Sequence, residues 1–420
     1  MTASVASPRL SQSLPPVYAA AALRLLLPLV VLPMVASRVG AEEFGRLGFI
    51  LVWASLLSMI VEGGFLAAAT RVAVTADATG RWRLARQVFS ARCLLCVPAM
   101  LLSVAAVQWA GGAAHRWQDT LAIAALACAL GWPATWYLQA TQQLNRWARV
   151  ELVVYGAMLL LCWALAHSVL AYVAFQLAAS TALALLGWWW LRRDLAEAHA
   201  GRSQLWAAHE LAPGLRLGWT MMPVSIAGAA YSFALPAAAS MQMAKTELGL
   251  YFMADRIVRA VLAAADPVFS VVYPRIVTLF TSGTRAALRY AARWALGGVL
   301  AGAALLLLGD MLWPLAEPLL APHAGGIDLQ RLHAVLRVLG WLLPLLLGWK
   351  FLGYWMLGSA RYDTAYRSCI VVGGVVGVLA AATVGGAAGA TGLAWTALGV
   401  EMLVIAVAVG GVMLTRALRG

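Results

Sequence analysis

Charged side chains are scarce in this 420-residue chain. Asp, Glu, Lys and Arg together make up 11% of the residues, against 63% that are hydrophobic, and the mean hydropathy is +0.82. Soluble globular domains carry about 25% charged residues, so the composition excludes an ordinary soluble protein. We expect the chain to lie in a lipid bilayer.

Residues that would form a catalytic or metal site are also few. The five cysteines, Cys93, Cys96, Cys128, Cys162 and Cys369, all lie in apolar stretches. Cys93 and Cys96 lie three positions apart, but neither a second cysteine pair nor a nearby histidine would complete a metal or redox site with them. We therefore expect the cysteines to be small packing residues. Walker A, HExxH and nucleophile-elbow motifs are absent. We therefore predict no catalytic residue, no metal and no bound cofactor.

Long apolar runs fill nearly the whole chain. A helical crossing of a bilayer needs about 20 apolar residues, and no loop between the runs could hold a globular domain. The expected fold class is all-α, a polytopic membrane protein with about twelve transmembrane helices. The expected spans are 16–37, 46–69, 87–110, 119–140, 150–167, 170–191, 216–239, 249–273, 287–310, 334–358, 365–386 and 391–414.

Basic residues are unevenly distributed between alternate loops. With the N-terminus inside, the inner segments hold about 20 arginines, Arg92 among them, and the outer segments about six basic residues. A bias of about threefold in short loops predicts that both termini are cytoplasmic. The same bias explains the net charge of +13 without nucleic acid, because no basic block with interleaved aromatic residues occurs.

The second and eighth spans indicate an internal repeat. Four chemically similar pairs lie 204 positions apart: Gly45 and Gly249, Glu62 and Asp266, Phe65 and Phe269, Arg71 and Arg275. We expect a duplicated six-helix unit, with pseudo-symmetric lobes 1–191 and 216–420 joined by a cytoplasmic linker, 192–215. Because six is even, both copies enter the membrane the same way, and a site is expected between them near mid-membrane.

Four cations lie inside expected spans: Arg24, Arg256, Arg259 and Lys350. Arg24 and Lys350 could extend to the headgroups or line a watery cavity. Asp255 and Arg259 are four residues apart and could pair on one helix face, which leaves one arginine for a ligand anion or another helix. Several cations in one cavity would suit a mono- or diphosphate.

Four acidic residues inside the spans are candidates for ion coupling: Glu62, Asp255, Asp266 and Glu401. Glu62 and Asp266 could instead stabilise helix ends through hydrogen bonds. Each lies nine residues before an arginine, Arg71 or Arg275, and about 13 Å along a helix is too far for direct pairing. The residues do not decide between H+ and Na+.

Short motifs in the first hairpin and in the fourth and eighth spans resemble a known family. They are Leu26-Leu27-Pro28-Leu29, Pro33, Gly40, Phe44-Gly45, Gly48-Phe49, Glu62-Gly63-Gly64-Phe65, Ala69-Thr70-Arg71, Trp136-x-x-Gln139, Asn145-Arg146, Gly249-x-Tyr251, Ala254-Asp255-Arg256-Ile257-Val258-Arg259, Pro267 and Tyr273-Pro274-Arg275. With them the chain resembles the bacterial Wzx-type oligosaccharide flippases of the multidrug/oligosaccharidyl-lipid/polysaccharide (MOP) exporter superfamily.

That resemblance implies an inner-membrane transporter with two lobes around a cationic cavity. It would move undecaprenyl-diphosphate-linked oligosaccharide between leaflets by alternating access, for lipopolysaccharide or exopolysaccharide synthesis. An H+ or Na+ gradient would drive it, and its partners would include the bilayer, a polysaccharide polymerase and chain-length machinery. The sequence departs from the family in the loop 40–44, which lacks a proline, and in Lys350.

Two other functions are compatible with the sequence. A MATE-like cation or drug antiporter would need an acidic or apolar cavity, which the cations inside the spans disfavour. A membrane polysaccharide polymerase or ligase would need a larger outer loop than 311–333.

Overall fold

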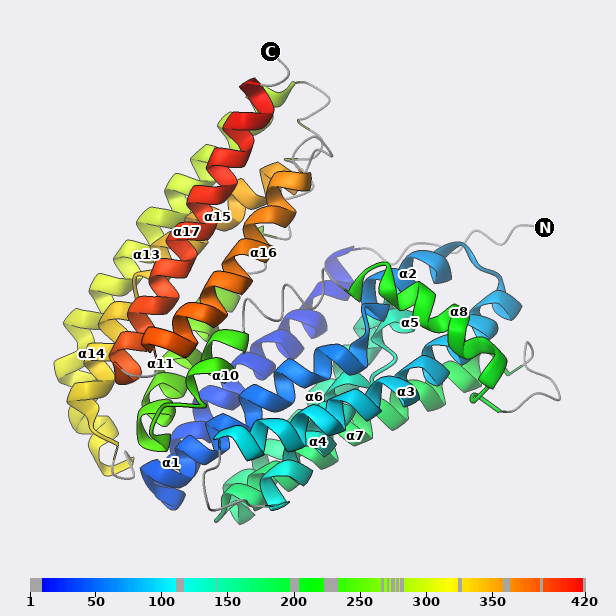
Figure 1. Ribbon diagram of the computed structural model, residues 1–420, viewed down its shortest axis with the longest axis horizontal. Helices are drawn as coiled ribbons and strands as arrows, with labels where there is room; N and C mark the ends of the chain where they lie inside the picture. Colours follow the sequence, from blue (N-terminus) through cyan, green and yellow to red (C-terminus); the bar gives the residue numbers. More distant parts are fainter. Residues whose placement is uncertain are drawn as a thin grey trace.

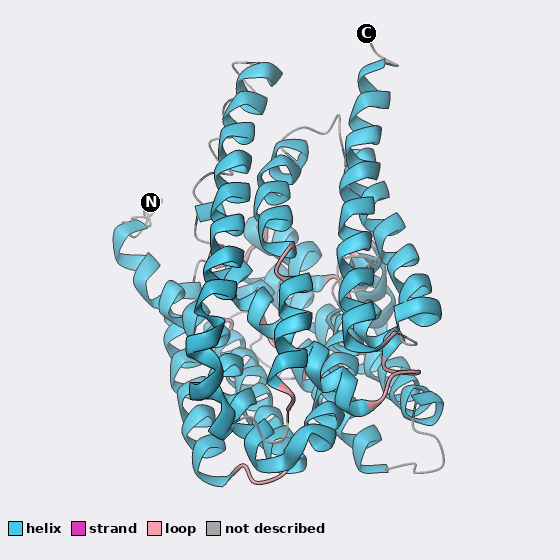
Figure 2. Ribbon diagram, turned by 90° about the vertical axis from the view of Figure 1, so that its left-hand side faces the viewer, coloured by secondary structure: helices cyan, strands magenta, loops and turns pink. Residues whose placement is uncertain are grey.

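The computed structural model describes residues 10–110, 117–141, 143–196, 204–222, 233–265, 268–269, 272, 276, 279, 283–323, 327–357, 363–385 and 388–417. Side chains are described from Met34 onward, except at 110, 145, 323, 354, 357, 363–367, 384–385 and 415–417. Within these residues every regular element is a helix (Figure 2), which confirms the all-α fold class.

In the first half of the chain, the described residues form helices that lie together in Figure 1. They are α1 (Leu10–Glu62), α2 (Phe65–Thr75), α3 (Ala78–Ala110), α4 (Trp117–Gly131), α5 (Thr135–Ala140), α6 (Leu144–Leu165), α7 (Val169–Asp194) and α8 (Ala208–Trp219). We call this set the N-terminal group.

The second half forms the C-terminal group, on the other side of Figure 1. Its helices are α10 (Leu235–Ala239), α11 (Lys245–Ala264), α13 (Thr284–Leu320), η3 (Ala321–His323), α14 (Leu329–Leu339), α15 (Leu342–Leu357), α16 (Asp363–Ala380), η5 (Ala381–Gly385) and α17 (Gly389–Ala417). The two groups meet where α1 passes α10 and α11, and diverge toward the end that carries both termini (Figure 1).

Eight helices in the described part are long and apolar enough to cross a membrane. Large apolar side chains remain exposed on their outer faces, for example Leu307 on α13, Leu185 on α7 and Met413 on α17. In water such surfaces would be unfavourable, so they are the faces that lipid covers. The chain is a multi-pass membrane protein.

Glycines mark where the long helices break. Gly40, with φ 80°, interrupts α1 between its first and second spans, so a very short turn connects them. Gly63 and Gly64, with φ +64° and +75°, end α1 and allow α2 to begin at Phe65. Only glycine adopts these backbone angles without strain.

The corresponding helix of the second half ends at an equivalent place. α11 ends at Ala264, which matches position 60 of α1 because 264 − 204 = 60, two residues before the end of α1 at Glu62. The two helices therefore end at nearly equivalent positions of the predicted repeat. In transporters built from repeats, paired breaks of this kind indicate where a substrate site lies.

Candidate functional site

The repeat-related glycines Gly45 and Gly249 pack against each other where α1 crosses α11. A Cβ atom on Gly45 would lie 1.6 Å from the carbonyl oxygen of Lys245, and one on Gly249 would lie 3.1 Å from the nitrogen of Gly45. Gly45 has no room for a side chain and Gly249 has very little, so the two backbones make direct contact. The pair expected from the 204-residue offset is thus the point at which the two groups join.

Further contacts extend this junction along α1. The rings of Phe44 and Phe252 lie 6.1 Å apart, and Gly48 faces Phe252. Trp53 donates a hydrogen bond of 3.1 Å to the hydroxyl of Ser240, just after α10. We call this surface, formed by residues 44–53 of α1 against 240–252, the closed end.

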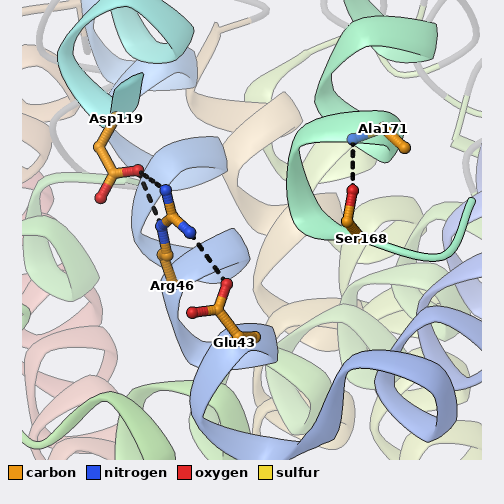
Figure 3. A network of polar contacts seen from close by, with 5 residues as sticks. All are labelled: Glu43, Arg46, Asp119, Ser168 and Ala171. Carbon is orange, nitrogen blue, oxygen red and sulfur yellow. Dashed lines mark hydrogen bonds and ion pairs between the residues drawn. The ribbon is translucent and has the colours of Figure 1, made fainter. Parts of the chain in front are cut away.

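Ion networks hold the helices on both sides of the closed end. Arg46 donates to Asp119 of α4 and, at 3.0 Å, to Glu43 (Figure 3). Arg46 and Asp119 are only 6% and 5% exposed, so this is a buried pair. Removing one member of such a pair typically costs about 3–5 kcal/mol, which makes the α1–α4 contact rigid.

The C-terminal group has a matching network. Glu247 of α11 pairs with Arg331 of α14 and accepts a 2.9 Å hydrogen bond from the backbone nitrogen of Ala390, at the start of α17. Glu43 and Glu247 are 204 positions apart, since 247 − 43 = 204. The repeat therefore extends to the acidic residues that brace each side of the closed end.

Arg256 lies one turn beyond the closed end on α11. Its guanidinium carbon is 4.8 Å from the ring centroid of Phe252, a cation–π distance. Arg256 therefore lies next to the closed end. That Arg256 lines a cavity between the lobes stays a prediction.

Asp255 and Arg259 form the ion pair expected from their spacing. The Nε atom of Arg259 lies 2.8 Å from both carboxylate oxygens of Asp255. Residues 255–259 still carry a net charge of +1, from two arginines and one aspartate. The structure thus combines a local pair with one excess cation on the helix that joins the two groups.

A small cavity of about 30 Å³ lies inside the C-terminal group, between α10, α11, α15 and α17. Its polar lining residues are Tyr251, Arg259 and Glu401, and the others are Leu, Val, Pro and Ala. Arg259 therefore faces both its partner Asp255 and a cavity that contains a second acid. Glu401 was expected from the sequence as a further coupling candidate.

Lys350 of α15 lies over the ring of Phe269, 4.2 Å from its centroid. In the N-terminal group Arg92 lies 5.7 Å from the centroid of Phe65. Phe65 and Phe269 are repeat-related, and both are buried. Each group therefore places a cation on the phenylalanine that follows its helix break, although the two cations come from different helices.

Glu62 stabilises a helix end. Its carboxylate accepts hydrogen bonds from the backbone nitrogens of Gly64 and Leu66, which are among the amides left unpaired at the start of α2. The structure favours the helix-end interpretation of Glu62. Its repeat partner Asp266 lies outside the described residues, as do Arg275 and the side chain of Arg24, whereas Arg71 is exposed on α2.

Two features of the site differ from the sequence analysis. Arg92, counted there with the loop arginines, is 1% exposed and donates to the carbonyl oxygens of Trp132 and Pro133, so it is an interior residue of the N-terminal group. The Arg46–Asp119 pair was not predicted, because its members are 73 positions apart. The only signal for this pair in the sequence was Asp119, an acidic residue at the start of an apolar run.

A family model described as polysaccharide biosynthesis protein matches residues 18–280. That range contains α1 from Tyr18 onward, α11 and the whole closed end. The chain belongs to this polysaccharide biosynthesis family. No curated protein matches it by sequence.

Solved structures similar to this family member are transporters of the MOP superfamily. An inward-facing multidrug resistance MATE transporter matches with TM-score 0.66 and 15% identity, over 94% of this chain and 95% of that one. The lipid II flippase MurJ, in an inward closed conformation, matches with TM-score 0.64 and 9% identity, over 95% and 86%. An outward-facing MATE transporter matches with TM-score 0.57 and 14% identity, over 96% and 94%.

These likenesses show the fold. The chain has the helical fold of these transporters, and it is a membrane protein of a polysaccharide biosynthesis family.

Proposed function

We propose that this protein is a flippase for undecaprenyl-diphosphate-linked oligosaccharide in the bacterial inner membrane. It would carry repeat units from the cytoplasmic to the periplasmic leaflet for surface polysaccharide synthesis. The family match supports a role in polysaccharide biosynthesis, and one solved structure of similar fold is a lipid II flippase. With both termini cytoplasmic, the two groups would diverge toward the cytoplasm, as in an inward-facing transporter.

The observation that carries the proposal is the position of Arg256. It lies on α11, within the span expected for residues 249–273, and beside the closed end. Burying a cation there is unfavourable unless a partner or water compensates it. A diphosphate headgroup supplies that partner, because guanidinium binds phosphate oxygens through paired hydrogen bonds. Arg24, Arg259 and Lys350 would add further positive charge.

The same charge disfavours a cation or drug antiporter, since like charges would repel the cargo. The cargo's lipid tail would stay in the bilayer while the headgroup passes between the two groups. The closed end, whose centre is the contact between Gly45 and Gly249, would open while the opposite end closes. An ion gradient would supply the energy, with Glu62, Asp255, Asp266 or Glu401 as the coupling acid.

The test uses a strain that lacks this protein. We expect the deletion to accumulate lipid-linked repeat units on the cytoplasmic leaflet, and the wild-type gene to restore their export. Arg256→Ala should lower export at least about tenfold, the effect of losing about 1.4 kcal/mol of phosphate binding. Arg289→Ala, which removes an exposed arginine of α13, should export normally at equal membrane content.

Two outcomes would contradict the proposal. Repeat units that still reach the periplasmic side in the deletion strain would indicate a polymerase or ligase. Normal export by Arg256→Ala would show that Arg256 does not bind the diphosphate.

A further inference from the structure

A cavity of about 440 Å³ lies at one end of the N-terminal group, between the start of α6 and the end of α7. Only residues 166–168 connect the two helices, so they are antiparallel and the first turn of α6 meets the last turns of α7. We call this cavity the basic pocket. It is lined by Arg146, Trp189, Trp190, Arg193 and Asp194, none of which belongs to the closed end.

The guanidinium groups of the basic pocket are not neutralised by an ion pair. Neither Arg146 nor Arg193 forms a salt bridge with a carboxylate in the described part of the chain. The Oδ2 atom of Asp194 accepts hydrogen bonds of 2.7 Å from Gln143 and 3.4 Å from the hydroxyl of Tyr137. Two arginines and one aspartate leave a net charge of +1, which suits a ligand with one negative charge.

Two tryptophans form the walls of the basic pocket. The guanidinium carbon of Arg193 lies 5.5 Å from the ring centroid of Trp189, a cation–π distance. The ring of Trp190 lies 6.5 Å from that of the buried Trp147, so this wall is fixed to the core of the N-terminal group. Tryptophan is enriched where hydrocarbon meets lipid headgroups, and the walls therefore indicate that the pocket lies at this depth.

An apolar surface leads away from the basic pocket along both helices. Leu185 lies four residues before Trp189 on α7, on the same helix face. Val153 and Leu160 lie seven and fourteen residues after Arg146 on α6, again on one face. All three aliphatic side chains are exposed, so lipid tails cover them. A ligand that matches both surfaces has an anionic head and apolar tails.

We propose that the basic pocket binds the headgroup of an anionic phospholipid of the phosphatidylglycerol class. Arg146 and Arg193 donate hydrogen bonds to its phosphate oxygens. The Oδ1 atom of Asp194 has no hydrogen bond in the described part and accepts one from a headgroup hydroxyl. Basic pockets between transmembrane helices select anionic lipids in this way. The lipid is bound on the surface of one group and is not cargo, so the inference goes beyond the proposed function.

The experiment measures lipid binding by native mass spectrometry of the purified, delipidated protein in detergent. We expect phosphatidylglycerol to bind the wild type at least tenfold more tightly than it binds Arg146→Ala with Arg193→Ala. Phosphatidylcholine has the same phosphate but neither a net charge nor a headgroup hydroxyl, so it should bind weakly to both proteins. Glycerol phosphate, a soluble source of the same headgroup chemistry, should not displace the lipid at equal concentration because it has no tails.

A matched control removes the same charge elsewhere. Arg285→Ala with Arg289→Ala, two exposed arginines of α13, should bind phosphatidylglycerol like the wild type. Arg146→Lys with Arg193→Lys keeps the charge and should bind more tightly than the alanine pair, which separates loss of the site from loss of the fold.

Three results would overturn the proposal: equal phosphatidylglycerol affinity of the wild type and the alanine pair, an equal loss in the α13 control, or phosphatidylcholine binding as tight as that of phosphatidylglycerol. Displacement by equimolar glycerol phosphate would assign the pocket to a soluble phosphate ester instead. No glycan cargo is present, so none of these results bears on the flippase test.

Discussion

At the scale of single residues, the closed end depends on two glycines, which have no side chain. Gly45 and Gly249 allow two helix backbones to touch, and a methyl group at Gly45 would overlap the carbonyl of Lys245. The adjacent Arg46 then anchors α1 to Asp119 of α4. A position without a side chain and a buried ion pair, next to each other in sequence, together fix the helix at the junction.

We expect Gly45→Ala to weaken this junction. Inserting a methylene-sized group into a filled contact costs about 1–3 kcal/mol, so the thermal unfolding midpoint in detergent should fall by several degrees. The matched control is Gly156→Ala on α6, where no atom lies within 4 Å of the new Cβ and alanine favours the helix by up to about 1 kcal/mol. Equal midpoints for the two variants would show that the glycine contact is not tight.

At the scale of elements, the short helix α8 is docked on the N-terminal group. Glu210, 3% exposed, accepts hydrogen bonds of 2.9 Å from Arg83 and 2.8 Å from Gln87 of α3. Gly214 and Gly218 lie against the carbonyl oxygens of Gln87 and Gly63. The segment that precedes the second half of the chain is thus attached beside the helix break of the first half.

The docking of α8 should depend on pH. Burial disfavours the charged form of Glu210, but the hydrogen bonds from Gln87 and Arg83 outweigh it and lower the pKa of Glu210 below its ordinary value of 4.5. A lowered folded-state pKa stabilises docking above pH 4.5, and this stabilisation is lost as the pH falls through the folded-state value. A nitroxide on Ala208→Cys should therefore gain mobility below pH 4.5.

The control for this titration is Glu210→Gln, which cannot ionise. Its label mobility should show no step in the acidic range and should resemble the low-pH state of the wild type throughout. A step of the same size in the Gln variant would assign the transition to another group.

At the scale of the whole molecule, the two groups touch where α1 packs against α10 and α11, and they diverge beyond this contact (Figure 1). Each group is braced separately, by Arg46 with Asp119 in one and by Glu247 with Arg331 in the other. Groups braced in this way can rotate about their interface with little internal change. Transport by this architecture requires the closed end to open.

A disulfide across the closed end should therefore block export. The Cβ position of Gly48 is 3.3 Å from the Cβ of Phe252, close to the usual 3.5–4.5 Å of a disulfide. We expect Gly48→Cys with Phe252→Cys to oxidise readily, to lose export at least about tenfold, and to recover it on reduction. The measurement is export of lipid-linked repeat units before and after adding a reductant.

The matched control lies within one group. The Cβ position of Gly187 on α7 is 3.6 Å from the Cβ of Ala134, so Gly187→Cys with Ala134→Cys should also cross-link, without effect on export. Full export by the oxidised Gly48–Phe252 pair would show that the closed end does not open during transport.

Local spacing explains which parts of the site could be predicted. The Asp255–Arg259 pair follows from residues four apart on one helix, and the Gly45–Gly249 relation follows from a constant offset of 204 positions. The position of Arg92 could not be predicted, because an arginine near a span end can either extend to the headgroups or turn inward. Its carbonyl partners Trp132 and Pro133 lie about 40 positions away.

The sequence by itself determined the membrane location and the all-helical class, because the length of the apolar runs is a property of the chain alone, and it predicts the duplicated halves from a constant offset. Tertiary structure decided which charges meet. A guanidinium in a low-dielectric interior interacts with whatever carboxylate, carbonyl or ring lies within a few ångströms, and that neighbour is set by how the helices pack. For this reason Arg46, Arg92 and Glu401 acquired their partners and surroundings only in the folded molecule.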